Sequence, residues 1–121
     1  MAGTYRSAAL VRGRDGHDLA VGQISGAASW GFVPRPETEA PVLDVIDLTK
    51  VQPLGQVRPN LYALHIEPTI GGAGYGAELP AGWILTSGIT HRDDESVSFF
   101  AVDLSDGRVV PLPPLGGYDR P

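Results

Sequence analysis

The chain lacks cysteine altogether: none occurs among its 121 residues. Disulfide bonds, thiolate metal sites and cysteine nucleophiles are therefore excluded. The lack of cysteine is compatible with any cellular compartment, so it does not decide where the protein works.

Basic residues are also scarce. Nine Lys and Arg residues stand against 14 Asp and Glu residues, which gives a formal net charge of −5 at pH 7. The basic residues are scattered along the chain, whereas a surface that binds nucleic acid needs them gathered in a stripe. We therefore expect no nucleic-acid partner.

Long apolar runs are missing as well. Nothing approaches the roughly 18 uninterrupted apolar residues of a membrane-spanning helix. The first residues, MAGTYRSAALVRGRDG, lack the apolar core of a signal peptide. The sequence thus predicts a soluble, cytoplasmic protein that does not contact a membrane.

The chain is instead rich in residues that interrupt helices, with 16 glycines and 11 prolines. Such a composition favours a turn-rich β protein. We predict one all-β domain over residues 1–121, either a sandwich or a small closed barrel of about seven or eight short strands. Three segments are expected to lie outside the strands. They are an exposed Pro-rich connector at 34–41, a Gly-rich loop at 68–82 and a Pro-rich tail at 113–121.

The C-terminal third predicts a three-stranded meander. Residues 83–90 and 97–104 are rich in β-branched and aromatic side chains and flank the polar loop HRDDES. A symmetric loop would pair Thr90 with Val97. Asp106-Gly107 predicts a two-residue type I′ turn into a last short strand.

This pairing has a consequence for the core. It places Trp83, Phe100 and Val102 on one face of the meander, together with Leu85 and Ile89, and that face is expected to supply most of the hydrophobic interior.

Earlier strands are predicted at several places. Residues 5–12 and 19–24 form a hairpin around Asp15-Gly16, and residues 61–67 alternate cleanly between two faces. The segment 41–51 has the i, i+3 polar spacing of a helix but many β-branched residues, so strand is favoured while helix stays open. Residues 52–59, QPLGQVRP, are predicted as a loop.

A metal site is one candidate function. His65 and Glu67 share one face of a strand, His91 lies in the HRDDES loop, and His17 near Asp15 and Asp18 would add a ligand. The alternative is an ordinary strand histidine beside a solvated acidic turn. No metal is favoured, and no cofactor is expected.

Part of this region resembles the cupin family of small double-sheet barrels. Residues 74–82, GYGAELPAG, match the opening G-x5-P-x-G of the second cupin motif. Leu85 stands where that motif has its histidine, and His65-Ile66-Glu67 stands where the first motif has H-x-H. The resemblance covers nine residues, so it implies an architecture and, as one alternative, a cupin-like metal-dependent protein.

A second alternative is a small barrel enzyme of the cyclase or isomerase type. An apolar substrate in the lumen would contact Tyr62, Gly74, Tyr75 and Trp83, with His65, Glu67 and Tyr75 as the catalytic candidates.

The leading hypothesis is a non-catalytic binding or assembly module, or a structural component of a larger complex. Proline-rich ends and glycine-rich loops outnumber catalytic signatures in this sequence. We expect a homo-oligomer or a protein partner, with an apolar small molecule as a further ligand class.

Overall fold

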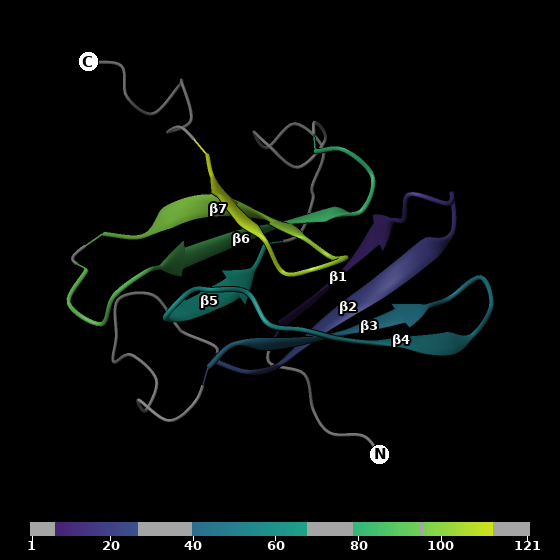
Figure 1. Cartoon of the computed structure of the whole chain (residues 1–121), viewed down its shortest axis with the longest axis horizontal. Coiled ribbons are helices and arrows are strands. Elements are labelled where there is room, and N and C mark those ends of the chain that lie inside the picture. The colour runs from purple at the N-terminus through teal and green to yellow at the C-terminus, as the bar shows by residue number, and fades with distance from the viewer. Residues whose placement is uncertain (1–6, 27–39, 68–78, 95, 113–121) are drawn as a thin grey trace.

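The computed structural model describes residues 7–26, 40–67, 79–94 and 96–112 and contains eight strands and no helix within them (Figure 1). The strands are β1 (Ser7–Arg12), β2 (Asp18–Ser25), β3 (Val42–Asp47), β4 (Gln52–Val57), β5 (Ala63–Ile66), β6 (Trp83–Ile89), β7 (Ser98–Asp103) and β8 (Val109–Pro111). The all-β prediction is confirmed, including the number of strands.

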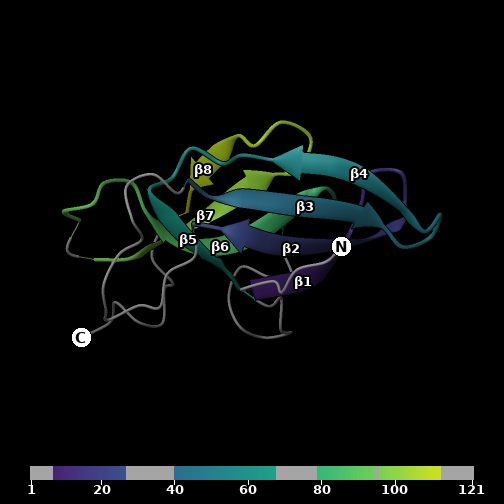
Figure 2. The same cartoon turned by 90° about the horizontal axis from the view of Figure 1, so that it is seen from below.

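The strands form two antiparallel sheets that pack as layers (Figure 2). Sheet A has the order β1-β2-β3-β4, and sheet B has the order β5-β6-β7-β8. The inner faces meet in one apolar core, formed by Leu19, Val21, Leu43, Val45, Val57, Leu61, Leu64, Ile66, Ile84, Phe100, Val102 and Leu104. The molecule is therefore a small sandwich, and the alternative of a closed barrel is wrong.

Sheet A begins with the predicted hairpin. Strands β1 and β2 pair from Ser7 with Gln23 to Arg12 with Asp18, and Gly16 takes the left-handed turn conformation at φ 87°. The ambiguous segment 41–51 is a strand followed by a turn, which settles that question against the helix.

The loop prediction for residues 52–59 is wrong, because β4 occupies Gln52–Val57. Pro53 has no N–H and disfavours a central strand, but β4 is the last strand of sheet A and needs hydrogen bonds on one side only. A bulge between the pairs Val45–Gly55 and Ile46–Pro53 absorbs the extra residue.

Sheet B contains the predicted meander in a different register. Ser87 pairs with Phe99 and Gly88 with Ser98, one residue away from the predicted pairing. This shift exchanges the faces of β6: Ile84 enters the core, whereas Trp83 lies on the outer face. The prediction of Phe100 and Val102 as core residues is confirmed. Leu85 and Ile89 are buried as predicted but lie on the outer face, and the prediction that Trp83 is a core residue on the Phe100 face is wrong.

The turn between β7 and β8 also differs from the predicted two-residue turn. Asp103 donates its N–H to the carbonyl of Arg108, and Gly107 donates to the carbonyl of Asp103. Four residues, 104–107, therefore lie inside the loop, and Gly107 supplies the positive φ of 84° at its end.

A buried amide joins the two sheets. The Gln23 side chain is fully buried, and its nitrogen donates to the carbonyl oxygens of Ser25 and, across the sheets, Leu64. Its oxygen accepts the hydroxyl of Ser7, which in turn accepts the N–H of Ile66. These bonds tie β1 and β2 to β5, so this side of the sandwich is closed by polar contacts.

Parts of the three predicted non-strand segments lie outside the described residues. Of the connector 34–41, Ala40 is exposed but Pro41 is fully buried, so its last residue does not fit the expected exposure. Residues 79–82 of the Gly-rich loop contain no strand, whereas residues 68–78 and the tail 113–121 are outside the described part. No helix in the described residues is long and apolar enough to cross a bilayer.

Candidate functional site

An open cavity of about 310 Å³ lies at one end of the sandwich, lined by residues of both sheets and their connecting turns. The β1–β2 and β3–β4 turns lie at this end (Figure 1). The buried core side chains at its floor are Leu19, Val45, Val57 and Leu104. The polar residues of its lining are Arg14, Asp15, Gln56 and Ser105. The cavity thus has an apolar floor beneath a polar rim.

The bulge of β4 forms one wall. Leu54 lies between the two paired residues Pro53 and Gly55, lines the cavity and keeps 54% of its surface exposed. Gly55 has φ 122°, and a Cβ added there would meet no heavy atom within 4 Å. The irregular edge strand therefore leaves open space where a regular strand would present a side chain.

An ion pair with a buried carboxylate holds Arg14 in the cavity lining. Arg14 donates from Nη2 to Oδ2 of Asp103 at 3.1 Å, and the Asp103 side chain is only 7% exposed. Burial opposes the ionisation of Asp103, but hydrogen bonds from the N–H and hydroxyl of Ser105 and from Arg14 outweigh it. Together they lower the pKa of Asp103 to about 2. The carboxylate is therefore ionised at neutral pH and holds Arg14 in place.

Gly82 makes room for this arginine. A Cβ on Gly82 would lie 2.9 Å from Cγ of Arg14, and its φ of 88° already disfavours other residues. Its N–H donates to the carbonyl of Arg12, and its carbonyl accepts the N–H of Leu104. Gly82 therefore connects the end of β1 to the β7–β8 turn while Arg14 lies across it.

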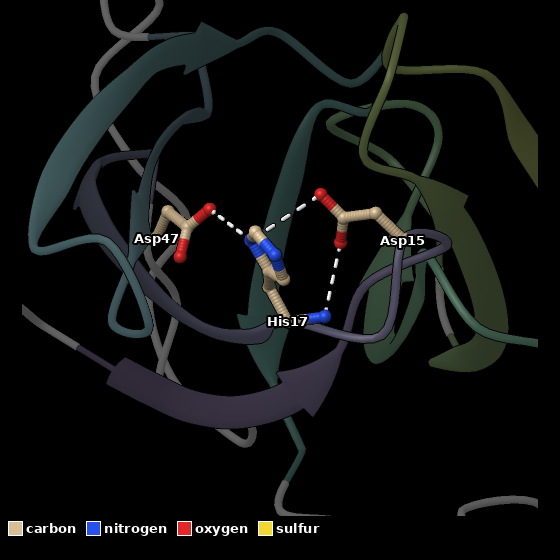
Figure 3. A group of neighbouring side chains, drawn as sticks. All are labelled: Asp15, His17 and Asp47. Carbon is tan, nitrogen blue, oxygen red and sulfur yellow. Dashed lines mark hydrogen bonds and ion pairs between the residues drawn. The ribbon is translucent and has the colours of Figure 1, made fainter.

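Asp15, at the cavity rim, belongs to a group with His17 and Asp47 (Figure 3). Nδ1 of His17 lies 2.7 Å from Oδ2 of Asp47 and 3.4 Å from Oδ2 of Asp15. The other oxygen of Asp47 accepts the N–H of Lys50, and Thr49 accepts the N–H of Asp18. These contacts fasten the β1–β2 turn to the β3–β4 turn.

The hydrogen bond from His17 is the largest of the effects that lower the pKa of Asp47, followed by the N–H of Lys50. Because carboxylates only accept hydrogen bonds, Nδ1 of His17 carries the proton in these contacts. Among the described residues, these three form a group that could hold a metal ion. Each offers one ligand atom, and the three ligand atoms lie within 4.8 Å of one another. A metal at Nδ1 would have to replace that proton.

The predicted residues His65 and Glu67 lie together on the outer face of sheet B. Nδ1 of His65 is 3.6 Å from Oε2 of Glu67, and the same oxygen accepts the hydroxyl of Ser87 at 2.6 Å. Ser87 is buried and pairs with His65 across β5 and β6. The sequence placed the first two on one face correctly, and the strand pairing adds the third.

His91 does not complete a metal site with them. Among the described residues, these three do not form a group of metal-ligating side chains. The loop of His91 is instead organised by Asp94, which accepts the N–H and hydroxyl of Thr90 and the N–H of His91. The N–H of Thr90 is the largest cause of the lowered pKa of Asp94.

Tyr62 and Trp83, two of the predicted ligand-binding residues, do not line the cavity. Tyr62 packs against Ala63 and Ile89, and Trp83 lies beneath the guanidinium of Arg108, whose Cζ is 5.1 Å from the ring centroid. Gly74 and Tyr75 are outside the described residues.

Most of the cavity has no signal in the sequence. Arg14 and Asp103 meet although they are 89 residues apart in the chain, and no local pattern marks such a pair. The sequence places His17 near Asp15, but its main partner Asp47 falls in the ambiguous segment 41–51. One feature of the sequence indicates the bulge at Leu54–Gly55: Gly55 follows Pro53 closely in a possible edge strand.

Comparisons of the chain with protein-family models, with curated proteins and with solved structures give no match.

Proposed function

We propose that the protein is a non-catalytic binding module, and that the cavity at the turn end of the sandwich is its ligand site. The observation that carries this proposal is the combination of an apolar floor with an arginine held at the wall by a buried carboxylate. Its size of about 310 Å³ suits a small ligand.

The floor favours an apolar ligand. Its core side chains are 4–9% exposed in the empty cavity, so a ligand would remove the remaining apolar surface from water. Their positions are fixed by the strands and turns that carry them, and a preformed site has little ordering cost on binding.

The wall favours an anionic group on that ligand. Arg14 uses Nη2 for Asp103, and its side chain is still half exposed, so further guanidinium N–H groups are available. The Asp15 carboxylate accepts the N–H of His17 and faces its imidazole, which limits its repulsion of an anion. The proposed ligand class is a compact, mainly apolar molecule with one carboxylate or similar anionic group.

The polar groups around the cavity already have structural partners, which supports binding over catalysis. Asp103 is engaged by Ser105 and Arg14, and Asp47 by His17 and Lys50. The barrel enzyme considered from the sequence needs a closed lumen, which the two open sheets do not form. A location in the cytoplasm and the absence of nucleic-acid partners stay predictions.

Fluorescence of anilinonaphthalene sulfonate, an aromatic anion, tests the proposal. We expect saturable binding to the native protein, competition by octanoate or benzoate, and roughly tenfold weaker binding to Arg14→Gln. Because that variant also deprives Asp103 of a partner, Leu54→Ser gives an independent measurement on a side chain that is 54% exposed. Val97→Lys, at an exposed position outside the cavity lining, is the matched control.

Equal binding by all four proteins, or none by the wild type, would contradict the proposed site. Near-UV circular dichroism of each variant checks that the probe reports on the native fold.

A further inference from the structure

The outer face of sheet A carries exposed apolar side chains beside the exposed ion pair of Arg12 with Asp18. Leu10 is 66% exposed and Ile24 is 37% exposed. The equivalent face of sheet B is largely closed, since Leu85 and Ile89 are 5% and 8% exposed. Exposed apolar side chains gathered on one sheet face favour an interaction surface.

Association through strand edges is hindered at three of the four edge strands, β4, β5 and β8. Pro53 on β4 and Pro111 on β8 lack the N–H groups that edge pairing requires. On β5, the opposite edge of sheet B, the N–H groups of Leu64 and Ile66 are bonded to Gly26 and Ser7. The side chains on the outer face of sheet A therefore offer a contact surface that needs no strand pairing.

The strand register orders this face into rows across all four strands. One row consists of Leu10, Ala20, Ile46 and Pro53. The neighbouring row consists of Ala8, Gly22, Asp44 and Gln56. From β1 to β4 the first row alternates larger and smaller side chains, and the second row has two small residues followed by two longer polar ones.

We propose that a second copy of this chain packs on the face, related by a two-fold axis parallel to the strands. Such an axis reverses the strand order, so that β1 lies over β4 of the other copy and β2 over β3. Ile46 of one copy then meets Ala20 of the other, and Leu10 meets Pro53. Each larger side chain of the first row faces a smaller one.

The second row matches under the same operation. Ala8 faces Gln56 of the other copy, and Gly22 faces Asp44, so short residues again lie opposite longer ones. The Asp44 carboxylates of the two copies lie on strands that do not face each other. Each accepts the Gln56 side-chain N–H of its own chain at 3.2 Å, which lowers the cost of covering it.

The area of the face sets the strength of association. Strands about 4.8 Å apart and residues spaced about 3.3 Å give a face of roughly 400 Å² for four six-residue strands. The total buried by two copies then falls below the roughly 1,200 Å² of stable interfaces. We expect a weak dimer whose population rises with protein concentration.

Sedimentation equilibrium over a wide concentration range tests this geometry. Ala20→Ile places two large residues opposite each other, and Ile46→Ala leaves two small ones, so each should weaken dimerisation by roughly tenfold. The double variant Ala20→Ile/Ile46→Ala exchanges the two sizes and should return the dissociation constant to near the wild-type value. Val97→Ala, at an exposed apolar position off this face, is the control.

A wild-type protein that stays monomeric at every concentration would overturn the proposal. So would a dimer that neither single variant weakens, or a double variant no better than the singles, because both results would rule out the reversed pairing. Circular dichroism shows whether each variant is folded. The probe-binding experiment is independent of these results, since neither position lines the cavity.

Discussion

The two sheets have four strands each but differ in what their outer faces meet. On sheet B, Leu85, Ser87, Ile89 and Ala101 are 8% exposed or less, whereas Leu10 on sheet A is 66% exposed. In sheet B, both faces of β6 therefore contribute to the packed interior. In sheet A, only the inner face does, and the outer face is left for contacts with another molecule.

The comparison explains why apolar content alone is a poor guide to the core. Leu85 and Leu10 are both outward-facing leucines in antiparallel strands, but their surroundings differ. The stability that each contributes should follow its burial, because the hydrophobic effect depends on the area removed from water.

The largest expected effect is on Leu85→Ala, which we expect to lower the free energy of unfolding by about 2–4 kcal/mol through lost burial and a residual cavity. Leu10→Ala should change it by less than about 0.5 kcal/mol. Urea unfolding at low protein concentration, where the monomer dominates, measures both values. Similar losses for the two variants would remove the distinction between the outer faces.

The sequence predicts the faces of a strand best where large apolar side chains alternate with polar or small ones. Residues 61–67 alternate cleanly, and the observed β5 faces follow that alternation. In β6, six of seven residues are buried, so apolar side chains occur on both faces and alternation cannot select the inner one. The one-residue register error between β6 and β7 follows from this ambiguity.

Strand β4 shows a second limit. Pro53 and Gly55 both oppose strand formation by local propensity, and the position at the sheet edge together with a bulge overrides them. The cavity is hard to predict from the sequence for the same reason, since Leu54 and Gly55 of β4 line it. Arg14 in the β1–β2 turn and Asp103 at the end of β7 are brought together only by the packing of the two sheets, which no local pattern records.

The two sheets also differ in the burial of their aspartates. Asp103 of sheet B is buried, whereas Asp44 of sheet A is partly exposed. The folded-state pKa of Asp103, about 2, lies below the ordinary 3.8, so its ionised form stabilises the fold fully above about pH 4. That contribution, at most about 2 kcal/mol, should be lost as the pH falls toward 2.

Urea unfolding of the wild type and Asp103→Asn from pH 5 to pH 2 measures this loss. The variant should be less stable than the wild type at pH 5 and should depend less on pH below 4, since it has no carboxylate to protonate. If Asp103→Asn kept the wild-type pH dependence, another group would be responsible.

The smallest expected effect is on the pKa values of two aspartates. Each lies beside a histidine, and each has a lowered pKa. For Asp47 the first cause is the imidazole of His17, whereas for Asp94 it is the backbone N–H of Thr90. His17→Phe should therefore raise the pKa of Asp47 toward its ordinary value, and His91→Phe should change that of Asp94 far less. Carboxyl ¹³C NMR titration measures both. Equal shifts would mean that the imidazoles act only through their charge, and that the turn-to-turn hydrogen bond of His17 has no separate role.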